Sequence, residues 1–202
     1  MGSKLVMGAG KERDSNIPLK FVDTLDTKKH IVLFYEDPDY ARKIEFQFIK
    51  NGLEKGEHCI YATEEDPGLI MLKMLNYGIS IKGYFQKGFL HVYQIRDGLD
   101  SLVEHIKSAK ENLKRILADS RPPVRLVSRI VADVSSLSGM TAEMKLEREF
   151  HNAFDDFGGS VICPYDITKI EASRSWIPYL LENHHAIIYA PKSRQGGVFF
   201  LR

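Results

Sequence analysis

The sequence contains no glycine-rich phosphate-binding loop, no long apolar run and almost no net charge. The formal net charge is +1, so the chain lacks the positive field of a dedicated nucleic-acid-binding protein. No apolar run approaches the roughly 18–20 residues that cross a membrane. The first 20 residues lack the apolar core of a secretory signal. These absences predict a cytoplasmic protein that neither crosses a membrane nor binds nucleic acid directly.

Only two cysteines occur, Cys59 and Cys163, and both lie within apolar segments. Two buried, reduced thiols fit a cytoplasmic protein better than a disulfide framework does. A nucleophilic Cys163 would need a nearby base to lower its pKa, and the spacing of the sequence supplies none. We therefore interpret Cys163 as a small buried hydrophobic residue and keep it only as a secondary ligand candidate.

What the sequence does contain is an alternation of short β-branched or aromatic runs with amphipathic helical patterns. The predicted strands cover residues 30–35, 58–63, 89–95, 124–134, 160–166, 186–190 and 198–201. Most are apolar on both faces, as expected for the central strands of a mostly parallel sheet. The order of elements predicts an α/β fold with a three-layer, doubly wound sheet.

The helical patterns lie between these strands and have apolar residues at helical spacing. They cover residues 41–52, 66–77, 99–117, 146–157 and 173–183. Gly78 and Gly158 follow two of these helices, where a left-handed cap is common. The polar, aperiodic residues 1–27 predict a flexible N-terminal arm, and residues 28–202 a single domain.

Ligands of open parallel sheets bind outside the carboxyl ends of the strands. The predicted strands deliver polar and aromatic residues there, and the ligand-binding candidates are Tyr35, Glu36, Thr63, Arg129, Asp133, Tyr165 and Asp166. The turn after the first strand reads YEDPD over residues 35–39, with three acids and no glycine. A phosphate loop needs glycines and a lysine, so ordinary nucleotide hydrolysis is not expected.

Two of these candidates lie near the end of the fourth predicted strand. Asp133 ends an apolar run, as the magnesium-orienting acid of RecA-like ATPases does, but a turn or cap role explains it equally well. Arg129 precedes Asp133 by four residues and would share its face of a strand. An arginine there needs a carboxylate partner or a polar cavity, so a structural ion pair is the alternative to ligand binding.

Histidines offer weaker signals. His30 opens the first strand at its amino end, away from the expected ligand edge, and is a secondary candidate. His184 and His185 are adjacent and cannot share a strand face, so they are poor joint metal ligands. We assign no metal site, no cofactor and no catalytic residue.

Four motifs together resemble the MEDS domain, the sensory domain of the repressor DcmR and of methanogen and methylotroph signalling proteins. They are HIVLFYE, FIKNGLEKGEHCIYAT, GISIKGYFQKGFLHVY and CPYD, in an order that covers roughly residues 28–191. The resemblance implies a RecA/KaiC-like fold without a working phosphate loop, which agrees with the missing loop. It also implies a sensor of small organic molecules and places His30 at a histidine position of the family.

The favoured hypothesis is a non-enzymatic sensory domain that binds a small organic ligand at the carboxyl edge. The residues flanking the resemblance are too few for a helix-turn-helix module. We therefore expect the signal to pass to a separate partner, such as a histidine kinase or transcription regulator, or through a homo-oligomer.

Two alternatives remain. One is a divergent nucleotide-binding ATPase in which Asp133, with Glu36 or Asp166, holds magnesium. Its phosphate contacts would come from Lys28 and Lys29, from Arg96 or from a neighbouring subunit. The other alternative is a protein-interaction scaffold that has no ligand.

Overall fold

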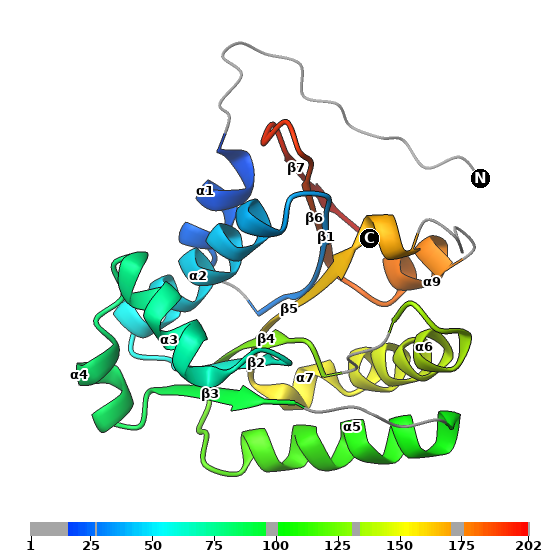
Figure 1. Ribbon diagram of the computed structural model, residues 1–202, viewed down its shortest axis with the longest axis horizontal. Coiled ribbons are helices and arrows are strands. Elements are labelled where there is room, and N and C mark those ends of the chain that lie inside the picture. Colours follow the sequence, from blue (N-terminus) through cyan, green and yellow to red (C-terminus); the bar gives the residue numbers. More distant parts are fainter. Residues whose placement is uncertain (1–15, 27, 96–100, 131–133, 171–175, 202) are drawn as a thin grey trace.

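A seven-stranded sheet forms the centre of the computed structural model, which describes residues 16–26, 28–95, 101–130, 134–170 and 176–201 (Figure 1). The strand order is β3-β2-β4-β5-β1-β6-β7. All neighbouring strands are parallel except the β6–β7 pair, which is antiparallel. The strands are β1 (His30–Tyr35), β2 (His58–Thr63), β3 (Leu90–Gln94), β4 (Val124–Ser128), β5 (Gly159–Asp166), β6 (Ala186–Ala190) and β7 (Gly197–Phe200). The α/β prediction is confirmed.

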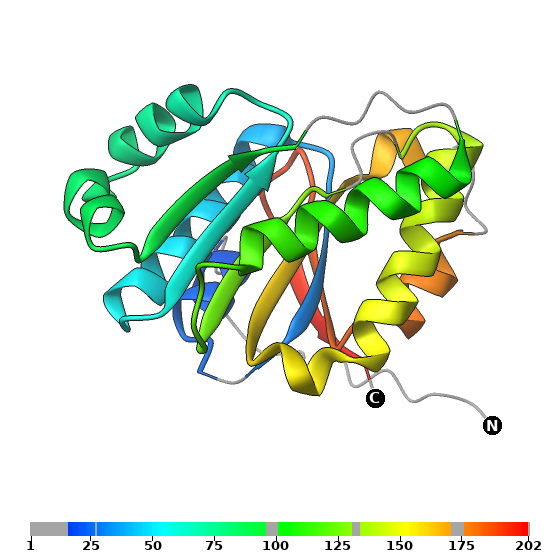
Figure 2. The same cartoon turned by 90° about the horizontal axis from the view of Figure 1, so that it is seen from below.

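Helices cover both faces of the sheet. One face carries α1 (Ile17–Asp23), α2 (Pro38–Glu54), α3 (Pro67–Asn76) and α4 (Ile81–Gln86). The other carries α5 (Leu102–Leu117), α6 (Leu137–Asn152), α7 (Phe154–Phe157), α8 (Ile167–Ile170) and α9 (Trp176–Glu182). Figure 2 shows α5, in green, and α6, in yellow, crossing the second face together. No described helix is long and apolar enough to cross a membrane.

The central strand β1 explains why there are two cores. All six of its residues are buried, and successive side chains point to opposite faces of the sheet. Ile31 and Leu33 therefore pack in the core under α1–α4, whereas Val32 and Phe34 pack in the core under α5–α9. The same alternation sends Tyr35 of β1 and Tyr165 of β5 into different cores, although both lie at the carboxyl edge.

The structure corrects several predicted elements. The arm predicted over residues 1–27 includes α1, whose Val22 is fully buried and which packs against α2. Strand β4 ends at Ser128, before the predicted end at residue 134, and residues 131–133 lie outside the described chain. Helix α6 begins at Leu137, nine residues earlier than predicted, because Ser136 caps its amino end. The glycine caps are confirmed, since Gly78 and Gly158 both have positive φ angles.

Candidate functional site

The carboxyl ends of β1, β2, β4 and β5 surround a pocket of about 120 Å³. The parallel strands bring these ends to one edge of the sheet, which is where ligands of such sheets bind. The lining residues are Tyr35, Thr63, Glu64, Glu65, Ser128, Arg129, Val134, Glu143, Pro164, Tyr165, Asp166 and Lys169. The pocket has room for a few water molecules or for a small organic molecule.

Five of the seven predicted ligand residues line this pocket: Tyr35, Thr63, Arg129, Tyr165 and Asp166. Tyr35 and Thr63 are the last residues of β1 and β2, and Arg129 follows β4 directly. The register between β1 and β5 places Tyr35 opposite Asp166. The structure therefore brings these residues together, and whether they bind a ligand stays a prediction.

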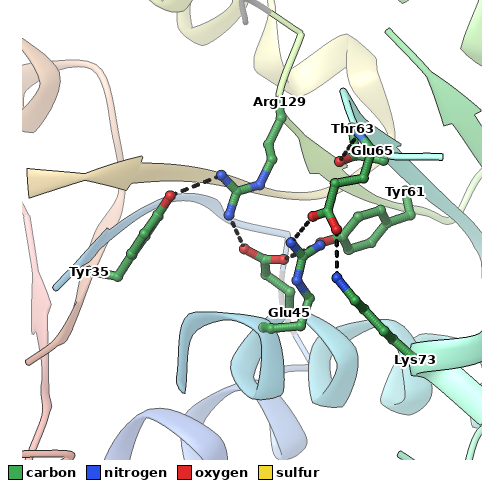
Figure 3. Close-up of polar contacts among 8 residues, drawn as sticks. Tyr35, Glu45, Tyr61, Thr63, Glu65, Lys73 and Arg129 are labelled. Carbon is green, nitrogen blue, oxygen red and sulfur yellow. Dashed lines mark hydrogen bonds and ion pairs between the residues drawn. The ribbon is translucent and has the colours of Figure 1, made fainter. Parts of the chain in front are cut away.

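Arg129 is the central cation of the pocket, and it is held from two sides (Figure 3). Its Nη2 lies 2.7 Å from Glu45 Oε1, and its Nη1 donates a hydrogen bond of 3.1 Å to the Tyr35 hydroxyl. The guanidinium carbon also lies 5.3 Å from the centre of the Tyr35 ring. Burial opposes its charge, but the Glu45 carboxylate, together with Tyr61 and Tyr35, raises the pKa of Arg129 above its ordinary value. The ion pair expected for Arg129 is therefore present, and its partner comes from α2.

Glu45 connects the pocket to a second set of charges on β2 and α3. It is fully buried, and it accepts a hydrogen bond from the Tyr61 hydroxyl. Arg42 donates to both Tyr61 and Glu65, and Lys73 Nζ lies 2.6 Å from Glu65 Oε2. Burial alone would raise the pKa of Glu65, but the hydrogen bond from Lys73 and the charge of Arg42 hold it below its ordinary value. On this side of the pocket, the side chains of Arg42, Glu45, Glu65 and Lys73 are therefore held in place by ion pairs and hydrogen bonds.

On the opposite side, Tyr165 links the pocket to a buried carboxylate. Its hydroxyl lies 2.5 Å from Oε1 of Glu143, which lines the pocket, and 2.5 Å from Oε1 of Glu147. A hydroxyl has one proton, so one of the two carboxyl groups must itself carry a proton. Burial and the nearby charge of Glu147 raise the pKa of Glu143 to about 8, so Glu143 is mostly the protonated partner at pH 7.

Glu36 lies outside the pocket, contrary to the position expected for it. Its carboxylate accepts hydrogen bonds from the Tyr189 hydroxyl at 2.6 Å and from the Lys192 backbone N–H at 3.1 Å. These two hydrogen bonds hold the pKa of Glu36 below its ordinary value. The side chain therefore fastens the turn after β1 to the connection between β6 and β7.

Asp37 has a related structural role. Its carboxylate caps α2 by accepting hydrogen bonds from the backbone N–H groups of Asp39 and Tyr40, and it lies 2.9 Å from Arg194 Nε. The amino end of α2 is where a phosphate would bind if this junction carried a phosphate loop. Because a carboxylate of the chain already occupies these donors, the junction is unsuited to phosphate.

Of the residues named for the nucleotide alternative, those that the structure describes are only partly gathered in the pocket. Asp133 and Arg96 lie outside the described residues. Lys28 and Lys29 precede β1 and lie at the amino edge of the sheet, opposite the pocket. Of the two carboxylates proposed as partners of Asp133 in holding magnesium, Asp166 lines the pocket and Glu36 does not.

The secondary candidates, His30 and Cys163, lie together in the core under α6. His30 Nε2 is 3.5 Å from Cys163 Sγ and 3.0 Å from Glu147 Oε2. Burial raises the pKa of the Cys163 thiol well above its ordinary value, so the structure supports a buried thiol rather than a nucleophile. His184 joins the same cluster, whereas His185 accepts a hydrogen bond from the His30 backbone N–H. The two adjacent histidines therefore have different partners, and the expectation that they do not act together as metal ligands stays a prediction.

Sequence reasoning missed Glu45, Glu143 and Lys169, because each comes from a helix rather than from a strand end. A partly buried arginine needs a carboxylate partner, and this rule predicted that Arg129 has one. It did not identify the partner as Glu45.

The comparisons with known proteins agree with this architecture. Residues 29–184 match the family model described as the methanogen/methylotroph, DcmR sensory domain, MEDS. A KaiC-like protein from the hyperthermophilic archaeon Pyrococcus horikoshii superposes with a TM-score of 0.56 at 13% identity, covering 81% of this chain and 71% of that chain. A second Pyrococcus horikoshii protein superposes with a TM-score of 0.55 at 10% identity, covering 91% of each chain. No curated protein matches the sequence. The predicted RecA/KaiC-like fold is confirmed.

Proposed function

The chain belongs to the MEDS family of sensory domains, and we propose that it senses a small neutral or cationic organic molecule at the carboxyl edge of its sheet. The observation that carries this proposal is the pocket lined by Tyr35, Arg129, Tyr165 and Asp166. Aromatic rings beside a few well-placed polar groups suit a small organic ligand.

The charge of the pocket favours neutral or cationic molecules over free anions. Its cations are Arg129 and Lys169, and Arg129 is already paired with Glu45. Its acids are Glu64, Glu65, Asp166 and the largely protonated Glu143. With Glu143 protonated, the three remaining carboxylates that line the pocket outnumber its two cations, so the lining disfavours a bare phosphate or carboxylate.

The pocket also lies where the two helical layers meet, which supports a signalling role. Arg129 is held by Glu45 of α2, on one face of the sheet, and Tyr165 is held by residues of α6, on the other. A ligand between Arg129 and Tyr165 would contact groups fixed by both layers and would favour one relative arrangement of them. The signal would pass to a protein partner, such as a histidine kinase or transcription regulator, or to a second copy of the chain.

Thermal-shift scans with halogenated, aliphatic, aromatic and amine compounds, and with Mg-ATP and Mg-GTP, test the proposal. A ligand at 100 times its Kd adds about 2.7 kcal/mol of stability. We expect an organic compound to raise the melting temperature and the nucleotides to leave it unchanged.

Tyr35→Phe removes the hydroxyl that accepts from Arg129 but keeps the aromatic wall, so it should weaken binding of that compound. Tyr77→Phe is the matched control, because it removes a hydroxyl that bonds to Gln47, away from the pocket. A shift with Mg-ATP, or an organic ligand insensitive to both Tyr35→Phe and Asp166→Asn, would contradict the proposal.

A further inference from the structure

We propose that His30, Glu147, Cys163 and His184 form a binding site for one zinc ion, buried between β1, β5, α6 and the segment before β6. The four ligand atoms, two imidazole nitrogens, one sulfur and one carboxylate oxygen, all lie within 4.8 Å of one another. All four residues are buried. The site is separate from the pocket at the carboxyl edge, and its existence does not depend on the proposed sensory function.

The fold brings these side chains together from distant parts of the chain. The register aligns His30 with Val161 and Val32 with Cys163, so His30 and Cys163 are diagonal neighbours on the same face of β1 and β5. Glu147 approaches from the buried side of α6, and His184 from the connection between α9 and β6. His30 Nε2 is 3.0 Å from Glu147 Oε2, and His184 Nε2 is 3.6 Å from the same oxygen.

The orientation of His184 is that of a metal ligand. Its Nδ1 lies 2.6 Å from the Leu180 carbonyl oxygen, and a carbonyl can only accept, so Nδ1 carries the proton. In the neutral ring, Nε2 then presents a lone pair to the Glu147 carboxylate, and this buried nitrogen has no hydrogen-bond partner among the described residues. Two lone pairs that face each other in the core repel unless a proton or a metal cation lies between them, and a metal ion bound by both atoms removes this repulsion. Metal-binding histidines typically donate their second ring N–H to a carbonyl or carboxylate in this way.

The donor set and its charge select zinc. A tetrahedral zinc ion with ligands at 2.0–2.3 Å has ligand-to-ligand distances of about 3.3–3.8 Å, which small side-chain adjustments reach here. Imidazole and thiolate donors favour zinc over magnesium or calcium, which take oxygen ligands. A thiolate and a carboxylate supply two negative charges, which balance the divalent ion inside a core where a net charge is costly. Four protein ligands close the site, as in structural zinc centres.

Metal content and cobalt spectra of the full chain test this site directly. The chain should be purified without metal-affinity chromatography, and its zinc measured per chain. We expect one zinc per chain and a lower melting temperature after zinc is removed with a strong chelator. Replacement by Co²⁺ should produce the visible bands of a tetrahedral site and a near-ultraviolet thiolate-to-cobalt charge-transfer band.

The two cysteines provide a matched pair of variants. Loss of a residue that only hydrogen-bonds to a metal ligand weakens metal binding by up to about 100-fold. Cys163→Ser removes a ligand itself, so it should weaken zinc binding by at least about 100-fold. It should also abolish the charge-transfer band. Cys59→Ser is the control, because Cys59 is equally buried but bonds to the Ile49 and Glu57 carbonyls on the other face of the sheet. His184→Gln should also weaken zinc binding, and it keeps the test valid if Cys163→Ser does not fold.

Absence of stoichiometric zinc in the purified chain together with absence of tetrahedral cobalt bands would overturn the proposal. A cobalt spectrum that Cys163→Ser leaves unchanged would also overturn it. The zinc content and the cobalt spectra report only on metal binding, so their outcome does not depend on whether an organic ligand binds at the carboxyl edge.

Discussion

At the scale of single residues, the position of the pocket residue Arg129 depends on Glu45, which does not itself line the pocket. Arg129 is exposed over 22% of its side chain, whereas its partner Glu45 is fully buried. Glu45 is a single acid among apolar neighbours on α2, between Ile44 and Phe46. Its burial is tolerated because Arg129, Arg42 and the Tyr61 hydroxyl all contact its carboxylate.

We predict that Glu45→Gln destabilises the protein by about 3 kcal/mol, because it keeps the side-chain volume but leaves Arg129 without its charge partner and Arg42 with Glu65 alone. Urea unfolding followed by circular dichroism measures this loss. Glu54→Gln is the control, since Glu54 lies at the end of the same helix, is 54% exposed and should change stability by less than about 0.5 kcal/mol. Equal stabilities of the two variants would mean that Glu45 does not hold the charge of Arg129.

The positions of Tyr35, Thr63, Arg129, Tyr165 and Asp166 could be predicted because each lies at or just after a strand end. Strand ends in a parallel sheet converge, so the sequence order of the strands was enough to place them at one edge. The position of Glu36 could not be predicted, because its partners Tyr189 and Lys192 are more than 150 residues away in sequence. Burial of a charged side chain, as for Glu45, depends on tertiary partners that no local pattern reveals.

At the scale of secondary-structure elements, the junction between β1 and α2 explains the acidic turn. Asp37 caps the helix and pairs with Arg194, while Glu36 binds the segment after β6. The acids therefore stabilise the turn and its contact with the neighbouring hairpin. The Asp37 carboxylate accepts from the backbone N–H groups that would otherwise be open to a phosphate at the amino end of α2.

We predict that Asp37→Ala lowers stability by about 1 kcal/mol, the usual cost of losing a helix cap. Asp37→Asn keeps an oxygen that can cap the helix, so it should lose only a small part of that stability. Thermal or urea unfolding of the two variants measures the difference. Equal losses would show that the charge of Asp37, rather than its capping oxygen, stabilises the junction.

The strands were easier to predict than the helices, for a physical reason. Strands β1 and β5 are buried on both faces along nearly their whole length, and their predicted bounds agree with the structure to within about one residue. The prediction failed for β4, where the apolar run continues beyond the end of the strand at Ser128. Helix α4 is only six residues long and has no fully buried residue, and α1 is short and lies in a polar stretch. The first turns of α6 contain serine, glycine and threonine, which weaken its helical pattern.

At the scale of the whole molecule, the sheet separates two hydrophobic cores. The pocket lies at the carboxyl edge, where Arg129 is bound to Glu45 of α2 (Figure 3). Tyr165 is bound to Glu143 and Glu147 of α6. The proposed zinc site lies deeper in the α6 layer, and its Glu147 also accepts from Tyr165. Ligand binding in the pocket would thus act on both layers at once.

Hydrogen–deuterium exchange with the most stabilising organic compound tests the location of the ligand most directly. We predict slower exchange at the carboxyl ends of β1, β2 and β5 and in α2 and α6, and unchanged exchange in β7 and at the amino ends of the strands. Tyr35→Phe should remove this protection at the same ligand concentration, and Tyr77→Phe should not. Protection confined to the acidic turn and the first turn of α2, or to the amino edge of the sheet, would contradict a sensory pocket at the carboxyl edge.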